Sequence, residues 1–385
     1  MPRGGTNRGE LATYRTVPKL KIKPIGPSQQ PACKAPNSFG VTTLIVACWI
    51  KLGKLGESIS KSNRRSVQAI MKTTDHGDAE QQTTNRVMMV RPIRFESNVQ
   101  TAATNAFQTE QGNLDAESIQ NFALAEFNAY VETLRHAGVI VHVFEDTPEP
   151  HTPDSMFPNN WISFHSNGTI VLYPMLTPNR REEVRPDLIS KLQSESDLSW
   201  PKTEDLTGLH EQGAILEGTG SVVLDRKHRI AYACRSPRTT DAGLEEFARR
   251  MRYELVVFDS VGFDGTPVFH TNVMMGIGTD FALVCAESIH DEVERGAVQT
   301  RLAETGHAVI PISLEQMQRF AGNFLALRSS DGVSLAVFSS GAHKSLNSAQ
   351  RTEIERFARI VHTPMNTIES HGGGGVRCLL AEVFG

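Results

Sequence analysis

The chain has 385 residues, of which 39% are hydrophobic and 21% charged, values that are typical of a soluble globular protein. Its five cysteines include no CxxC pair, which excludes a zinc framework and a disulfide scaffold. Residues 1–70 hold 12 of the 39 basic residues but only 2 of the 43 acidic ones, so 71–385 carries a net charge of −14. This acidity argues against a nucleic-acid partner.

The first 70 residues are rich in Pro, Gly, Ser and Lys, and their apolar run at 41–50 is too short to span a bilayer. Three interpretations stay open: a disordered tail, a basic organellar transit segment, or a start assigned too early, with Met71 as the true initiator. We expect 1–83 to be a disordered or targeting extension and 84–385 to be the folded domain. The expected location is the cytoplasm, or an organelle if the extension is a transit segment.

From residue 84 onward a unit recurs in the sequence. A helix is expected over 117–138, where apolar residues recur at helical spacing and Gly138 is placed as a C-cap. A strand follows at 139–144, then a polar stretch and a hairpin formed by 161–165 and 169–174. Further hairpins are expected at 221–225 with 229–234, at 273–277 with 281–285, and at 324–328 with 333–338. Helices are expected around 242–251 and 291–306, and the last unit is cut short.

One polar residue stands at the head of each hairpin. These residues are Asn160, Glu217, His270, Asn323 and Cys378, separated by 57, 53, 53 and 55 positions. No single unit can bury its own strand face, so five units are expected to close on one another. The sequence therefore predicts an α/β fold, a five-fold pseudosymmetric α/β propeller (pentein), whose hairpin heads converge near one axis.

That axis would gather a thiol, an imidazole and a carboxylate. Cys378 follows a GGGG run whose backbone can approach a ligand closely, and a thiol beside His270 is a candidate nucleophile. Glu217 would fix the tautomer or the charge of His270. Each residue alone has an ordinary structural alternative, such as core packing or a turn, and their shared phase in the repeat favours the catalytic interpretation.

Two further residues are candidates for substrate binding. Asp154 would bind a substrate ammonium or amide N–H, or else cap a turn after Pro153. Arg238 follows the second strand of a hairpin and would clamp a carboxylate, or else form a surface ion pair. No metal-ligand quartet, nucleotide-binding GxGxxG or P-loop lysine occurs in the sequence, so we expect no cofactor and no metal.

Together the motifs DSMFPNNWISFHSNG, AILEGTGSVVLDR, ACRSPRT, FHTNVMMGIG and GGGGVRC resemble the guanidino-group-modifying (amidinotransferase/arginine deiminase) superfamily, and most nearly its citrulline-utilisation hydrolases of CtlX type. The resemblance covers roughly 84–385. It implies a five-fold propeller in which Cys378 is the nucleophile, His270 the general acid/base and Glu217 its acidic partner. It also implies that Arg238 holds a substrate α-carboxylate and that Asp154 lines the pocket.

Two positions depart from the deiminase pattern, which has aspartates where this chain has Asn160 and Asn272. An ionised carboxylate only accepts hydrogen bonds, whereas an asparagine donates and accepts, which suits a neutral ureido group better than a guanidinium. We therefore expect a hydrolase that converts citrulline to ornithine through a covalent cysteine intermediate. The alternatives are an arginine deiminase, a dimethylarginine hydrolase or a non-catalytic propeller that only binds. A small molecule is the expected partner, without nucleic acid or membrane, and the oligomeric state stays open.

Overall fold

The computed structural model describes residues 80–108 and 114–385. The predicted extension over 1–83 lies almost entirely outside these residues. The chain divides after Asp75, and the unit from His76 to Gly385 contains every residue that is described. No helix within the described ranges is long and apolar enough to cross a membrane.

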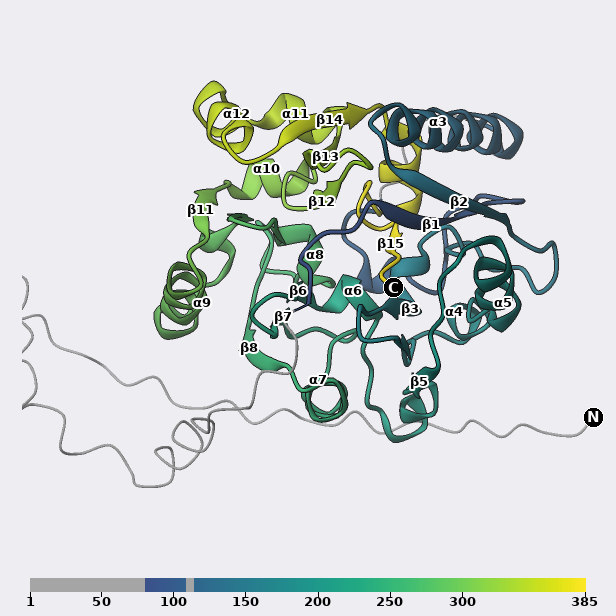
Figure 1. Cartoon of the computed structure of the whole chain (residues 1–385), viewed down its shortest axis with the longest axis horizontal. Helices are drawn as coiled ribbons and strands as arrows, with labels where there is room; N and C mark the ends of the chain where they lie inside the picture. Colours follow the sequence, from purple (N-terminus) through teal and green to yellow (C-terminus); the bar gives the residue numbers. More distant parts are fainter. Residues whose placement is uncertain (1–79, 109–113) are drawn as a thin grey trace, which may run out of the picture. The chain divides into compact units, whose positions relative to one another are not determined.

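Five three-stranded sheets form the described part of the chain (Figure 1). In each sheet a short inner strand pairs antiparallel with a middle strand, which pairs parallel with an outer strand. The inner strands are β15 (Ala381–Glu382), β3 (Ile162–Phe164), β6 (Val223–Asp225), β9 (Met275–Ile277) and β12 (Leu325–Arg328). The middle strands are β1 (Arg86–Arg91), β4 (Thr169–Leu172), β7 (Ile230–Cys234), β10 (Phe281–Val284) and β13 (Ser334–Ser339). The outer strands are β2 (Ile140–Glu145), β5 (Lys202–Asp205), β8 (Glu254–Phe258), β11 (Ala308–Pro311) and β14 (Arg359–Thr363).

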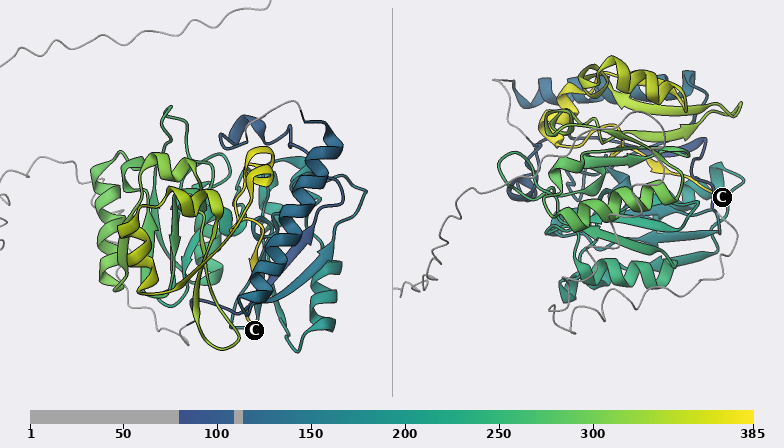
Figure 2. Two further views of the ribbon diagram at one scale, coloured as in Figure 1. Left: turned by 90° about the horizontal axis from the view of Figure 1, so that it is seen from above. Right: turned by 90° about the vertical axis from the view of Figure 1, so that its left-hand side faces the viewer.

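Neighbouring sheets meet through their inner strands, with β15 against β3, β6 against β9 and β9 against β12. The longer helices lie outside the strands, as the views from other directions also show (Figure 2). These helices are α3 (Ala116–His136), α5 (Pro186–Glu195), α7 (Asp241–Met251), α9 (Glu292–Glu304) and α12 (Ser348–Glu355). The predicted five-fold α/β propeller is confirmed.

The two ends of the described chain share one sheet. Strand β15, near the C-terminus, pairs antiparallel with β1, with Met88 opposite Ala381. Strand β1 in turn pairs parallel with β2. The last unit looks truncated in the sequence because its middle and outer strands stand at the start of the domain.

The three predicted helices, α3, α7 and α9, begin and end within two residues of the expected positions. Asp115 caps α3 by accepting a hydrogen bond from the Ser118 amide at 2.7 Å, and Gly138 follows the helix with φ of 87°. A positive φ costs glycine little, so the chain can reverse there into β2. Asp291 caps α9 in the same way through two amides.

The strands expected at 221–225 and 273–277 begin later than predicted. Their first residues form the short helices α6 (Gly218–Ser221) and α8 (Thr271–Met274). The Thr271 hydroxyl donates to the Ser221 carbonyl at 2.6 Å and accepts from the Cys234 amide at 2.8 Å. Side-chain bonds to the backbone thus replace strand pairing at these positions.

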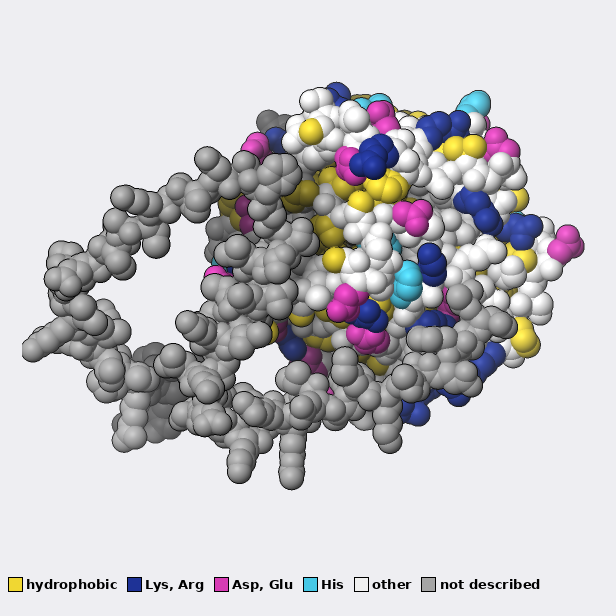
Figure 3. Space-filling model, turned by 60° about the vertical axis from the view of Figure 1, so that its left-hand side comes forward, with side chains coloured by type: hydrophobic (Ala, Val, Ile, Leu, Met, Phe, Trp, Pro, Cys, Tyr) yellow, Lys and Arg dark blue, Asp and Glu magenta, His cyan; other side chains and the backbone are white. Residues whose placement is uncertain are grey.

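Aromatic side chains fill the space between the last two complete sheets. The ring of Phe324 stacks between Phe281 and Phe338, with centroids 5.4 Å and 5.3 Å away. All three rings are buried, and burying such a ring contributes about 2 to 3 kcal/mol. On the face drawn in Figure 3, basic and acidic side chains lie next to one another.

Candidate active site

The thiol of Cys378 lies among amides. Its Sγ is 3.4 Å from Asn323 Nδ2 and 3.8 Å from Asn272 Nδ2, and the residue is 5% exposed. Burial raises the pKa of Cys378, while the hydrogen bond from Asn323 and the positive charge of Arg377 oppose the rise. At rest Cys378 is therefore a protonated thiol. The side-chain amides of Asn323 and Asn272 already point N–H donors at its sulfur, where they would stabilise a thiolate formed during a reaction.

His270 and Glu217 form a buried pair. His270 Nε2 lies 2.9 Å from Glu217 Oε2, and the two residues are 2% and 0% exposed. Burial lowers the pKa of His270 to about 4, although Glu217 opposes this. Burial raises the pKa of Glu217, but Arg238, Arg180 and His270 outweigh it and hold that pKa well below its usual range. At neutral pH the site thus contains a neutral imidazole bonded to a carboxylate.

Gly220 packs between His270 and Asn160. A Cβ at this position would lie 2.8 Å from His270 Nδ1 and still closer to Asn160 Nδ2. The Nδ1 atom of His270 and the side-chain amide of Asn160 therefore both face the Cα atom of Gly220. Because Nε2 already bonds Glu217, Nδ1 is the nitrogen that is free to exchange a proton.

An arginine that the sequence analysis did not select lies at the centre of the charged groups. Arg180 in the short helix α4 (Pro178–Arg181) donates to Glu217 at 3.1 Å, to Asn160 Oδ1 at 3.0 Å and to both oxygens of Glu183 at 2.9 and 3.0 Å. It also lies 3.5 Å from the Asp154 carboxylate. Burial lowers the pKa of Arg180, but these three carboxylates outweigh burial and raise it.

Glu183 completes this cluster. Burial raises its pKa, Arg180 opposes this, and the nearby carboxyl groups of Asp154 and Glu217 also raise it, to about 8 in all. Arg180 donates to both oxygens of Glu183, and Arg180 and Arg238 both lie beside Glu217. The carboxyl groups of Glu183 and Glu217 are thus already paired with buried guanidinium groups of the protein.

The two asparagines that depart from the deiminase pattern are both buried. Asn160 Oδ1 accepts a hydrogen bond from Arg180. The Nδ2 atom of Asn160 makes only a 3.5 Å contact with the Glu217 backbone carbonyl. Asn272 directs Nδ2 to the thiol, and its Oδ1 has no hydrogen-bond partner among the described residues. The site thus retains one weakly used donor and one free acceptor.

Arg238 is engaged by the protein itself. It lies 3.5 Å from Glu217 Oε2 and donates to Thr104 Oγ1 at 2.8 Å and to the Thr101 carbonyl at 3.1 Å. The same segment, 98–105, reaches Asp154, whose Oδ2 accepts from Asn98 Nδ2 at 2.8 Å. A substrate carboxylate would have to replace the contacts between Arg238 and this segment.

The predicted residues fall into connected groups. Glu217, His270, Arg238, Asp154 and Asn160 belong to one hydrogen-bonded and charged network around Arg180. Asn272 contacts Cys378 and stands in α8, two residues after His270, so the thiol group and this network are adjacent along the chain. The repeat could have indicated Arg180 because, like Arg238, it follows the second strand of a hairpin. No pattern in the sequence indicated the 98–105 segment.

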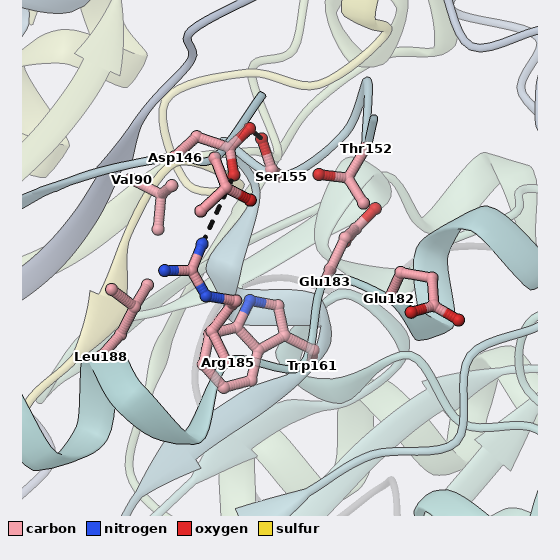
Figure 4. Close-up of a pocket in the computed structure, with 10 residues that line it drawn as sticks. Val90, Asp146, Thr152, Ser155, Trp161, Glu182, Glu183, Arg185 and Leu188 are labelled. Atoms are coloured by element: carbon pink, nitrogen blue, oxygen red, sulfur yellow. Dashed lines mark hydrogen bonds and ion pairs between the residues drawn. The ribbon is translucent and has the colours of Figure 1, made fainter. Parts of the chain in front are cut away.

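Two hollows adjoin the site. One, of about 240 Å³ including space open to solvent, is lined by Ser155, Trp161 and Glu183, and Arg185 points across it toward Asp146 (Figure 4). The other, of about 400 Å³, is lined by Thr219, Asn272 and Arg377 together with residues of the inner strands. The lining of the second hollow runs from Asn272, which contacts Cys378, to Ile277 and Arg226 at the other ends of β9 and β6.

The fold and this buried Cys–His–Glu set define a class: hydrolases of the amidinotransferase superfamily that act on non-peptide C–N bonds. A family model described as "N,N dimethylarginine dimethylhydrolase, eukaryotic" matches residues 91–385, and the chain belongs to that family. No match was found among curated protein sequences.

Solved structures of several enzymes have the same fold. The N-terminal domain of ArgZ, an arginine dihydrolase from Cyanobacteria, is 17% identical with a TM-score of 0.60, over 78% of this chain and 98% of that one. A mutant of AgrE in complex with L-arginine is 17% identical with a TM-score of 0.60, over 77% of this chain and 40% of that one. A dimethylarginine dimethylaminohydrolase adduct with S-methyl-L-thiocitrulline is 15% identical with a TM-score of 0.53, over 78% and 99%. Membership of the CtlX-type branch stays a prediction.

Proposed function

We propose that this enzyme hydrolyses citrulline to ornithine, carbon dioxide and ammonia through a covalent intermediate on Cys378. One observation carries the choice of substrate: the carboxyl groups of Glu183 and Glu217 are already paired with Arg180, and Asn160 and Asn272 offer one amide donor and one amide acceptor. A cationic head group would bring an additional charge into a site without an unpaired carboxylate, which costs free energy. A ureido group brings none.

The donor and acceptor suit the two sides of a ureido head group. Asn272 Oδ1 would accept from a ureido N–H, and Asn160 Nδ2 would donate to the ureido oxygen. Such a hydrogen bond becomes stronger as negative charge develops on that oxygen. Each well-placed donor lowers the activation free energy by about 3 kcal/mol. Asp154 would orient the N–H groups, and Arg238 would bind the α-carboxylate once it exchanges its contacts with Thr101 and Thr104.

The reaction begins with proton transfer from the Cys378 thiol to His270 Nδ1. The thiolate then forms a bond to the ureido carbon, and the C–N bond to the side-chain nitrogen breaks as His270 returns its proton to that nitrogen. Ornithine leaves, and the enzyme retains a carbamoyl group on sulfur. Water, deprotonated by His270, breaks the C–S bond to give carbamic acid, which decomposes to carbon dioxide and ammonia.

Glu217 keeps its charge throughout this cycle. Its bond to Nε2 fixes the tautomer in which Nδ1 is basic, and it stabilises the imidazolium that forms transiently. Arg180 and Arg238 hold the carboxylate in place. These arginines would therefore act as positioning residues for His270 as well as defining the charge of the site.

A guanidino amino acid is the second candidate substrate. It is supported by the family of the chain, whose description names dimethylarginine, and by the AgrE complex with L-arginine. On this alternative, the guanidinium would be neutralised by an ionised Glu183. Binding of a cationic substrate would then tighten as pH rises through about 8, whereas binding of citrulline would not.

Purified protein should be assayed separately with citrulline, arginine and dimethylarginine, by release of ornithine and of citrulline. Ornithine from citrulline, lost in Cys378→Ser, supports the proposal. Citrulline from arginine or dimethylarginine, without turnover of citrulline itself, overturns it in favour of the guanidino alternative. Binding of substrate by both proteins, without turnover in either, would identify a binding module.

A further inference from the structure

A group of metal-ligating side chains lies away from the catalytic residues. Asp225, His228 and His307 each offer one ligand atom, and these atoms all lie within 4.8 Å of one another. Asp225 is the last residue of β6, whereas Glu217 precedes this strand. The group therefore lies at the end of the strand opposite to the active site.

We propose that Asp225, His228 and His307 bind a divalent transition-metal ion, zinc in the first place. The donor set of two imidazoles and one carboxylate matches what zinc takes in proteins and leaves a fourth position for water. The chain supplies these ligands at a site separate from the thiol, so the metal has no part in the proposed hydrolysis.

The distances between donor atoms fit an ion placed among them. His228 Nδ1 lies 2.9 Å from an Asp225 oxygen, and His307 Nδ1 lies 3.9 Å from Asp225 Oδ2. Zinc about 2.1 Å from each tetrahedral donor places the donors roughly 3.4 Å apart, which is between these two values.

The fold brings these ligands together from two adjacent sheets. Asp225 and His228 come from the end of β6 and the turn that leads to β7, and His307 precedes β11 of the neighbouring sheet. The two imidazole rings meet edge to face, with centroids 5.9 Å apart. The Thr305 hydroxyl lies 2.8 Å from His307 Nδ1, so this nitrogen would exchange that hydrogen bond for the ion. A bound ion would therefore link the sheet of β6 to the sheet of β11.

A hydrogen bond between His228 and Asp225 accounts for only part of this arrangement. It explains neither the approach of His307 nor the hydroxyl of Tyr232, which is fully buried without a hydrogen-bond partner among the described residues. Asp225 pairs with Ile230, and Tyr232 is two residues further along the strand, so both side chains lie on one face of the sheet. A water on the ion would offer that hydroxyl a partner.

The test uses the full chain carrying Cys378→Ser, which removes the reactive thiol as a competing ligand. After treatment with a chelator, Co²⁺ is titrated and followed by visible absorption, and Zn²⁺ is then added to displace it. We expect one Co²⁺ per chain, displaced by Zn²⁺, and a melting temperature that rises with Zn²⁺. His228→Ala, at a partly exposed position, should weaken binding at least tenfold and abolish the rise in melting temperature.

The matched control is His362→Ala. His362 stacks on His343 in another sheet, with centroids 4.3 Å apart, and is exposed. Its loss should leave Co²⁺ binding unchanged, and His307→Gln should reproduce the effect of His228→Ala. Co²⁺ binding that His228→Ala leaves intact, no binding at all, or a sulfur-to-cobalt charge-transfer band would each overturn the proposal.

Discussion

Asn272→Asp tests the role of the amide that faces the thiol. Asn272 Nδ2 lies 3.8 Å from Cys378 Sγ, so a carboxylate in its place would put a negative charge beside the sulfur. At that distance, with an effective dielectric constant of about 20, the repulsion of a thiolate is about 4 kcal/mol. This corresponds to a rise of roughly three units in the pKa of Cys378.

The assay is the rate of alkylation of Cys378 by iodoacetamide as a function of pH, located by peptide mass spectrometry. The Asn272→Asp profile should shift to higher pH, with a rate at neutral pH at least a hundredfold lower than that of the wild type. Citrulline turnover should fall in parallel. Asn272→Ala is the control, because it removes one neutral hydrogen bond worth about 1 kcal/mol. Superimposable profiles for Asn272→Asp and the wild type would refute the account of this amide.

Further substitutions test the buried network. Gly220→Ala should abolish turnover because the added methyl group meets His270 Nδ1, whereas Gly208→Ala, with no atom within 4 Å, should leave it intact. Glu217→Gln leaves two buried guanidinium groups without their shared carboxylate, so it should reduce the free energy of unfolding by about 3 to 5 kcal/mol in urea denaturation; a loss no larger than that of Glu245→Gln, at an exposed position, would contradict this. The folded-state pKa of Glu183 is raised to about 8, so its contribution to stability is lost as pH rises from its unfolded value through 8. Glu183→Gln should therefore change the melting temperature more favourably at pH 8.5 than at pH 5.5, and an equal change at both would count against the raised pKa. The pKa of His270 near 4 predicts that kcat/KM for citrulline stays level down to about pH 5 and falls below it, and a fall centred near 6.5 would show a solvated imidazole.

The repeat predicted much of the site because each site residue occupies the same position within its own repeat, which can be recognised from neighbouring residues in the sequence. Glu217, His270, Asn323 and Cys378 stand at the same point of successive hairpins, and the fold brings Glu217 against His270 and Asn323 against Cys378. The periodicity of α3 and its capping residues likewise depend on neighbours in the sequence, which made the helix predictable.

Other features depend on contacts between distant segments. Strand β1 pairs with β15 across almost the whole domain, and no local pattern marks that pairing. The engagement of Arg238 by Thr101 and Thr104 joins residues more than 130 positions apart. Arg180 lies in a charge-dense stretch that resembles a solvated helix end, and only the fold reveals that its side chain is buried among three carboxylates.

The covalent intermediate on Cys378 tests the central claim most directly. The enzyme should be mixed with citrulline, quenched in acid within the first turnover, and its intact mass and Cys378 peptide measured. The account predicts a carbamoyl group on Cys378, absent from Cys378→Ser and from enzyme quenched without substrate. An unmodified sulfur during active turnover of citrulline, or an adduct formed only from arginine or dimethylarginine, would contradict it.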